Sequence, residues 1–184
     1  MALVLPRDAL ERARAPLPEA RMLPPAAYTD AAVLDWEREH VFDGGWVAAC
    51  HVGALATPGS QMAAALGRGS ALLVRHGDAI RAFANVCRHR GHELVPVGTS
   101  SCRPSVVCPY HAWSFDLDGR LRRATGGAGF DADDLGLVPL RAAEHLGWVF
   151  VNASGDAPPV EEAFAGLVRW FADAYLTDRD EEAP

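Results

Sequence analysis

Two short stretches, Cys87-Arg-His89-Arg-Gly91 and Cys108-Pro-Tyr-His111-Ala-Trp113, decide how this sequence is interpreted. Each stretch holds one cysteine and one histidine, and a spacer of 18 residues, 90–107, separates His89 from Cys108. Thiolates and imidazoles are ligands that proteins use for iron–sulfur clusters and zinc. The two stretches therefore predict a metal centre built by two loops.

The spacing suits a [2Fe–2S] cluster with two kinds of ligand. In Cys87-x-His89 both side chains leave one tight loop, which can supply a sulfur to one iron and a nitrogen to the other. Cys108-x-x-His111 does the same from the opposite side. We expect Cys87 and Cys108 on one iron and His89 and His111 on the other. Neutral imidazoles raise the potential to about −150 to +300 mV, against about −400 mV for an all-cysteine plant-type centre. The chemistry implied is one-electron transfer.

Zinc is the competing interpretation, because two Cys and two His with short spacings also describe many tetrahedral structural sites. The residues around the ligands favour iron and sulfur. His89-Arg-Gly91 after the first pair and Pro109-Tyr110 within the second are not required by a zinc finger. A structural zinc module is therefore the less favoured hypothesis.

The flanking residues also resemble a known family. Residues 85–94 and 107–119 match, almost position by position, the motifs of Rieske ferredoxins and ring-hydroxylating (Rieske non-haem iron) oxygenases. The likeness runs from about Leu23 to Leu176 and is to the N-terminal half of an oxygenase α-subunit. The resemblance implies a mainly β fold, a Rieske-type antiparallel β-sandwich with flanking N- and C-terminal helices.

In that family the chain is part of an oxidoreductase. A reductase or ferredoxin gives electrons to the [2Fe–2S] cluster, and a mononuclear Fe(II) in a larger C-terminal domain receives them, commonly across a homotrimer to the neighbouring α-subunit. That iron is held by two His and one carboxylate. The nearest candidate triad here, Glu37, His40 and His51, lacks the family's position and context. We therefore expect the mononuclear site only in a C-terminal catalytic domain beyond this chain.

Five residues beside the ligands are expected to support the cluster. The Tyr110 hydroxyl can donate to a sulfur and raise the potential. Gly91 can permit a close backbone approach, and Trp113 can shield the inner side of the cluster. Arg90 places positive charge beside it, as does Arg88. An ion pair is an equally good hypothesis for both arginines.

The other cysteines separate subtypes of the family. Respiratory Rieske proteins carry a third Cys in each loop, which form a disulfide, whereas His92 and Tyr110 stand at those places here. Cys50 lies in an apolar run and is expected to be a small buried residue. Cys102 lies in the spacer. A disulfide between Cys50 and Cys102 is an open alternative, although a cytosolic chain would keep both reduced.

Composition fits one folded domain. The 184 residues are 49% apolar and 22% charged, and the net charge is −7. All 17 basic residues are arginines. The acidic balance argues against nucleic-acid binding and favours either a partner with a basic patch or simple solubility. No run approaches the ~20 apolar residues that span a bilayer. Because Arg7 and Asp8 interrupt the first apolar residues, we expect no secretory signal and a cytoplasmic protein.

We divide the chain into four segments. Residues 1–27, rich in proline, are expected to form an extended arm. Residues 28–45 are expected to contain a leading helix, capped by Thr29 or Asp30 and ended by Gly44-Gly45. The Rieske domain occupies 46–154. Residues 155–184 form a C-terminal helix or linker from Pro158 toward an absent catalytic domain, with an apolar stripe. Within the domain we predict strands at 46–52, 61–66, 71–75, 79–85, 114–116, 121–124, 138–143 and 148–152.

Two functional hypotheses follow. The first is the electron-transfer domain of an oxygenase that hydroxylates or demethylates a small organic substrate, and the leading helix and the region of Tyr28 favour it. The second is a self-standing Rieske ferredoxin-like carrier without a substrate site, which the C-terminal end of the chain at Pro184 favours. Nothing in the sequence specifies the substrate.

Overall fold

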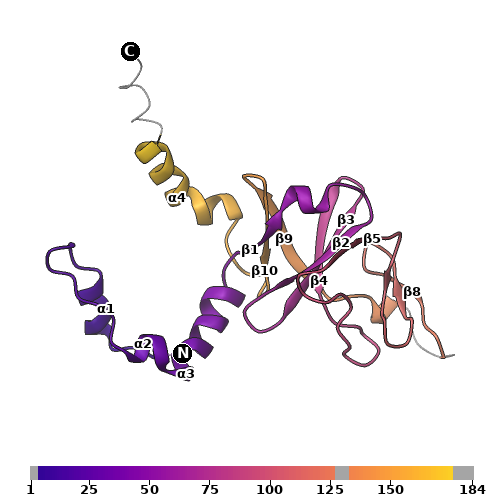
Figure 1. Ribbon diagram of the computed structural model, residues 1–184, viewed down its shortest axis with the longest axis horizontal. Helices are drawn as coiled ribbons and strands as arrows, with labels where there is room; N and C mark the ends of the chain where they lie inside the picture. The colour runs from indigo at the N-terminus through magenta and orange to yellow at the C-terminus, as the bar shows by residue number, and fades with distance from the viewer. Residues whose placement is uncertain (1–3, 127–132, 176–184) are drawn as a thin grey trace, which may run out of the picture.

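The computed structural model describes residues 4–126 and 133–175 and shows an antiparallel β-domain with helices leaving one end (Figure 1). The larger sheet has seven strands in the order β1-β10-β9-β4-β3-β2-β5. All the pairings in this sheet are antiparallel. Its strands are β1 (Val47–His51), β2 (Ser60–Ala65), β3 (Ser70–His76), β4 (Ala79–Ala84), β5 (Ser100–Cys102), β9 (Pro139–His145) and β10 (Trp148–Asn152).

A smaller sheet carries the second half of the predicted metal centre. It consists of β6 (Val106–Val107), β7 (Ser114–Phe115) and β8 (Leu121–Arg123), also antiparallel. The prediction of a mainly β antiparallel domain is confirmed, and its eight predicted strands are all present. Strands β5 and β6 were missed, because pieces of three and two residues carry no readable alternation. Two short 3-10 turns, η2 (Val52–Leu55) and η3 (Asp133–Leu135), complete this part.

The interior strand β3 contributes side chains to two separate cores. Leu72 and Val74 belong to one buried cluster of ten residues, which also contains Cys87 and Cys108. Ala71 and Leu73 face a second cluster, which includes Val149 and Val151 of β10. Because side chains alternate along a strand, one strand supplies both cores. The two predicted ligand cysteines thus belong to the core itself, and they do not lie on a surface appendage.

The N-terminal segment is not the extended arm that we predicted. Helix α1 spans Arg7–Ala13, and α2 covers Ala26–Thr29. Pro6 stands at the N-cap, where proline costs no hydrogen bond, and the next proline is Pro16. Ion pairs four residues apart, Arg7–Glu11 at 3.2 Å and Arg12–Asp8 at 2.6 Å, support the turns between. The prolines therefore bound a helix that the prediction overlooked.

The leading helix begins and ends where the sequence indicates. The Asp30 carboxylate accepts the Ala32 N–H at 2.9 Å and caps α3 (Ala31–Glu37). The helix then widens into a π-helical stretch, η1 (Arg38–Asp43). It stops at Gly44, where a Cβ would lie 2.8 Å from the His40 carbonyl oxygen. Only a glycine fits this stop.

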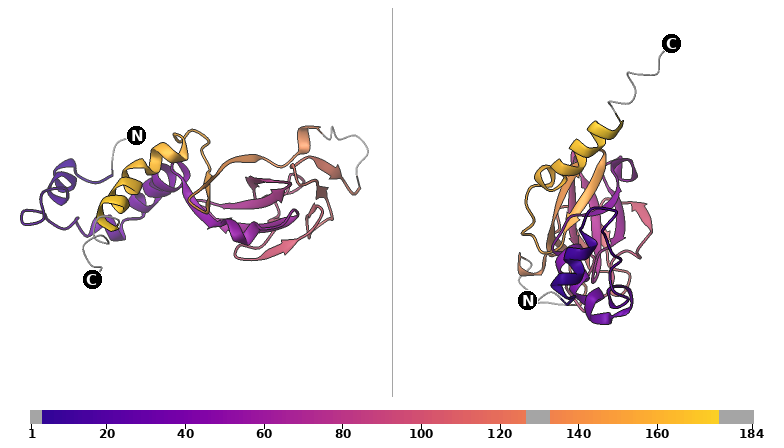
Figure 2. Two further views of the ribbon diagram at one scale, coloured as in Figure 1. Left: turned by 90° about the horizontal axis from the view of Figure 1, so that it is seen from above. Right: turned by 90° about the vertical axis from the view of Figure 1, so that its left-hand side faces the viewer.

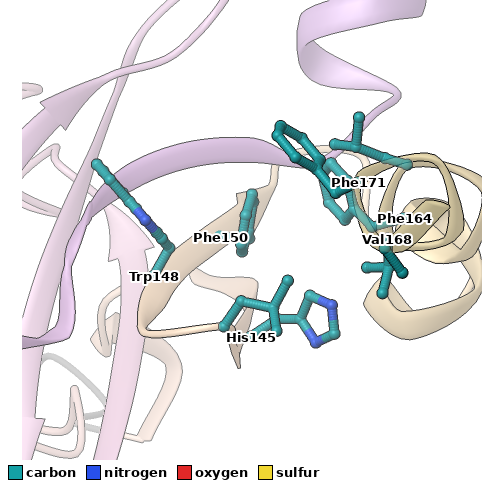
Figure 3. Close-up of a pocket in the computed structure, with 9 residues that line it drawn as sticks. His145, Trp148, Phe150, Phe164, Val168 and Phe171 are labelled. Atoms are coloured by element: carbon teal, nitrogen blue, oxygen red, sulfur yellow. The ribbon is translucent and has the colours of Figure 1, made fainter. Parts of the chain in front are cut away.

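Helix α4 (Val160–Tyr175) follows β10, and its apolar stripe is only partly covered. Val160 is buried, and Phe164 packs on Phe150 with 4.8 Å between ring centroids. Leu167 and Val168 stay 49% and 41% exposed. Together with the β9–β10 hairpin, these side chains line an apolar groove of about 540 Å³ (Figure 3).

The helices and the smaller sheet lie at opposite ends of the domain. Helices α1 to α4 leave one end of the sheets, whereas β8 lies at the other (Figures 1 and 2). Among the described helices, none is both long and apolar enough to cross a bilayer. The domain boundaries that we predicted stay a prediction.

Candidate metal centre

The first loop, residues 87–92, follows β4 and is closed by two backbone hydrogen bonds. The Cys87 N–H donates to the His92 carbonyl oxygen at 2.8 Å, and the Gly91 N–H donates to the Cys87 carbonyl oxygen at 3.0 Å. The fifth residue, Gly91, has a φ of +71°. A Cβ there would meet nothing within 4 Å. The left-handed backbone explains why a glycine suits this position. The close backbone approach that we expected at Gly91 stays a prediction.

The second loop, residues 108–113, connects β6 to β7 and repeats this pattern. The Cys108 N–H donates to the Trp113 carbonyl oxygen at 2.8 Å, and the Ala112 N–H donates to the Cys108 carbonyl oxygen at 3.1 Å. Its fifth residue, Ala112, has a φ of +56°. The two loops thus share one backbone form, with a cysteine first and a left-handed residue fifth. They differ in the histidine, which is third in one loop and fourth in the other.

The loops bring the two cysteine thiols together inside the core. Cys87 and Cys108 are each 2% exposed, and both are free thiols. Burial raises the pKa of Cys87, and the neighbouring Cys108 thiol raises it further. The backbone N–H groups of His89 and Arg90 oppose these effects. A bound cation would reverse this balance, because metal coordination deprotonates a thiol.

The two histidines of these loops also lie beside each other. The ring centroids of His89 and His111 are 4.9 Å apart. Burial, followed by the charges of Arg90 and His111, lowers the pKa of His89, so the neutral form that binds metals is favoured. Nδ1 of His111 is buried, and no described residue provides it with a hydrogen bond. A buried nitrogen without a partner is expected where an absent group would bind it.

The donor set fits a [2Fe–2S] cluster. Two thiols form one pair and two imidazoles form the other, as a Rieske centre requires. Nδ1 of His111 is a buried imidazole nitrogen without a hydrogen-bond partner, and such a nitrogen can bind iron. Within residues 4–126 and 133–175, no group of three or more His, Cys, Asp or Glu side chains is arranged to hold one metal ion. The assignment of the four ligands stays a prediction.

Trp113 and Thr125 brace the centre from inside. The Trp113 side chain is 2% exposed, and its ring stacks on His89 with 4.7 Å between centroids and 3° between planes. Its indole N–H donates to the Thr125 carbonyl oxygen at 3.4 Å. The Thr125 hydroxyl donates to the His111 carbonyl oxygen. The shielding of the cluster by Trp113 stays a prediction. The sequence does not indicate a role for Thr125, because this residue follows β8 and lies outside both cysteine–histidine stretches.

Tyr110 lies on the outer side of the loops. It is 56% exposed, and its ring centroid is 3.7 Å from that of His111 and 5.3 Å from that of His92. No hydrogen bond joins its hydroxyl to another described residue. Its proposed effect on the cluster potential stays a prediction. Arg90 is exposed, and Arg88 donates to the Asp134 carbonyl oxygen at 3.4 Å.

The alternative triad has other contacts. His40 stacks on Trp36 at 4.5 Å, and its Nδ1 lies 2.9 Å from the Trp36 carbonyl oxygen. The Nδ1 of His51 accepts the Gly53 N–H at 3.1 Å. Cys50 is buried in β1, and Cys102 is exposed in β5, with both thiols free. The structure therefore contains no disulfide between these two cysteines.

Comparison with known proteins agrees with this geometry. Residues 45–129 match the family model described as the Rieske [2Fe-2S] domain. The carnitine monooxygenase oxygenase subunit of Escherichia coli K12 is 40% identical over 153 residues. The glycine betaine monooxygenase oxygenase subunit of Pseudomonas aeruginosa PAO1 is 31% identical over 148 residues. The chain contains a Rieske [2Fe–2S] domain.

A solved structure is similar as well. The quaternary ammonium Rieske monooxygenase CntA superposes with a TM-score of 0.73 at 35% identity, over 82% of this chain and 42% of that one. The alignments cover 81% of this chain and 41% of the E. coli protein, and 79% and 34% for the P. aeruginosa protein. The chain thus spans about two fifths or less of these relatives. The similarity is therefore to the Rieske part of oxygenase subunits.

Proposed function

We propose that this domain relays single electrons from a reductase or ferredoxin to a mononuclear non-haem iron. That iron would lie in an oxygenase catalytic domain, in the same polypeptide or in a neighbouring subunit. The observation that carries the proposal is the pairing of two buried thiols with two adjacent imidazoles by loops of one backbone form. The similarity to oxygenase subunits supports it independently.

Four residues would hold the cluster. The thiolates of Cys87 and Cys108 would bind one iron, and the imidazoles of His89 and His111 the other. When bound, the cluster supplies reversible one-electron chemistry at a potential of about −150 to +300 mV. Because Nδ1 of His111 is the buried donor, Nε2 is left to hold a proton. Release of that proton on oxidation would make the potential fall as the pH rises.

The acceptor is proposed from the relatives. The structure of CntA is described as giving insight into inter-subunit electron transfer. A homotrimeric assembly would allow the same route here, with a catalytic domain of the next subunit receiving the electron. The exposed apolar stripe of α4 supports the presence of a further domain, since apolar patches of this kind mark interaction surfaces.

The substrate class follows from the same comparisons. Several relatives are named for carnitine or glycine betaine, and CntA is described as a quaternary ammonium monooxygenase. We propose that the whole enzyme oxidises a quaternary ammonium compound in the cytoplasm. The alternative of a self-standing carrier is less favoured, because the relatives named above are oxygenase subunits.

Metal analysis of the purified domain tests the proposal. We expect two iron atoms and two acid-labile sulfides per chain, and an EPR signal in the reduced state. The midpoint potential of the cluster should fall as the pH rises. A protein that binds zinc alone, with no sulfide, would contradict it. The intact mass of the polypeptide in its native cell tests the oxygenase part separately. We expect more than twice the 19.7 kDa of this chain, and a mass near that value would favour the self-standing carrier.

A further inference from the structure

We propose that Thr125 is the positioning residue that couples the two histidine ligands. The inference rests on the proposed function, because it concerns the side chains that would hold the cluster. Thr125 belongs to neither loop. It follows β8 and is half-buried behind the second loop.

The two polar ends of Thr125 contact two different parts of the centre. Its hydroxyl donates to the carbonyl oxygen of His111, the ligand of the second loop. Its own carbonyl oxygen accepts the indole N–H of Trp113 at 3.4 Å. The hydroxyl thereby restrains the His111 backbone next to the Cα that carries the imidazole.

Trp113 carries the constraint to the other loop. Its ring lies flat on His89, with 3° between the ring planes. Its backbone carbonyl also accepts the Cys108 N–H at 2.8 Å. The orientation of His89 in the first loop therefore depends on an indole that is anchored at Thr125. One residue outside both loops thus holds both imidazoles, which lie 4.9 Å apart.

The consequence concerns how the histidines meet iron. Groups that orient metal-binding histidines commonly change metal affinity or activity 10- to 100-fold when they are removed. A serine or threonine hydroxyl can serve here, whereas a valine has the same shape without a donor. Loss of the hydroxyl should therefore allow the His111 imidazole a wider range of orientations without altering the ligands themselves. The backbone carbonyl of residue 125, which accepts the Trp113 N–H, is retained.

The test compares Thr125→Val with Thr125→Ser in the holo-protein of the full chain. We expect Thr125→Val to lose its cluster at least about tenfold faster than wild type, measured by the decay of visible absorption in the presence of an iron chelator. Its reduced-state EPR lines should broaden, and the pH dependence of its midpoint potential should shift. Thr125→Ser should restore wild-type behaviour in all three measurements.

Thr99→Val is the matched control, because the Thr99 hydroxyl also donates to a backbone carbonyl, that of Pro96, at 2.6 Å. It should leave the EPR lines and the potential unchanged. Equal effects of Thr99→Val and Thr125→Val would overturn the inference, as would a Thr125→Ser protein that behaves like Thr125→Val. Wild-type cluster properties in Thr125→Val would do the same.

A second variant keeps the inference testable if Thr125→Val does not fold. Trp113→Phe retains a ring against His89 but removes the N–H that reaches Thr125. We expect faster cluster loss and broader EPR lines than in wild type, and unchanged lines would count against the coupling. Failure of the proposed function is distinguishable, because the wild-type protein itself would then contain no [2Fe–2S] cluster.

Discussion

Loops 87–92 and 108–113 have the same backbone hydrogen bonds but are held from outside in different ways. The second loop ends in Trp113, which is buried and reaches Thr125. The first loop ends in His92, which is exposed and whose Nδ1 lies 2.6 Å from the carbonyl oxygen of the adjacent Glu93. One backbone form thus builds both halves of the centre, whereas only the second loop ends in a buried side chain.

The ligands should contribute equally in spite of this difference. We expect Cys87→Ser and Cys108→Ser each to abolish the cluster completely, because each removes a thiolate from the same iron. Iron and sulfide content and the reduced-state EPR signal measure the loss. His111→Ala should have the same result. Wild-type iron content and an unchanged EPR spectrum in His111→Ala would refute the ligand assignment.

Removal of the metal should reveal a difference in local order between the two loops. In the apo-protein we expect the Gly91 amide to exchange with solvent at least about tenfold faster than the Ala112 amide, since buried packing retains local order. Hydrogen exchange followed by NMR measures both amides, which donate equivalent hydrogen bonds. Equal exchange rates would mean that the bracing by Trp113 and Thr125 does not order the second loop.

The fifth positions provide a matched pair of substitutions. An alanine with positive φ costs about 1 kcal/mol relative to glycine. Gly91→Ala should therefore lower the free energy of unfolding by about 1 kcal/mol, and Ala112→Gly should raise it by up to that amount. Chemical denaturation of the apo-proteins measures both. Changes of the same sign would show that the loops do not share this backbone requirement.

Tyr110 should give the smallest effect. We expect Tyr110→Phe to keep the cluster and to lower its midpoint potential slightly, because the hydroxyl can stabilise the reduced state. The 56% exposure of the residue limits the size of the change. Protein-film voltammetry of both proteins at one pH measures it. Identical potentials would contradict a hydrogen bond from the Tyr110 hydroxyl to the cluster, and the role of Tyr110 would then be to pack on His111.

Much of the fold could be predicted because its signals are local. The continuous apolar run of β3, the Asp30 cap and the stop at Gly44-Gly45 each depend on neighbouring residues. Strand β5 could not be found, because its pairing depends on β2, which is distant in the sequence. Strand β6 could not be found, because its two residues carry no readable pattern. The helix α1 was missed because proline content was averaged over a segment in which the prolines lie at the helix boundary and beyond it.

Part of the candidate site could likewise be predicted from the sequence, and part could not. The spacing of Cys87, His89, Cys108 and His111 indicates a common centre, and the loops do bring these residues together. Thr125 could not be predicted, since its contacts with His111 and Trp113 depend on the path of the chain after β8. The left-handed form of Ala112 was equally hidden, because alanine rarely adopts it.

Mössbauer spectroscopy of the domain reconstituted with ⁵⁷Fe tests the central claim most directly. The claim is that two thiolates hold one iron and two imidazoles hold the other. It predicts two iron sites of equal intensity with different parameters, of which only the imidazole-bound site becomes ferrous on one-electron reduction, because neutral ligands favour the lower charge. A single type of iron site, or a protein that retains no iron, would contradict the account.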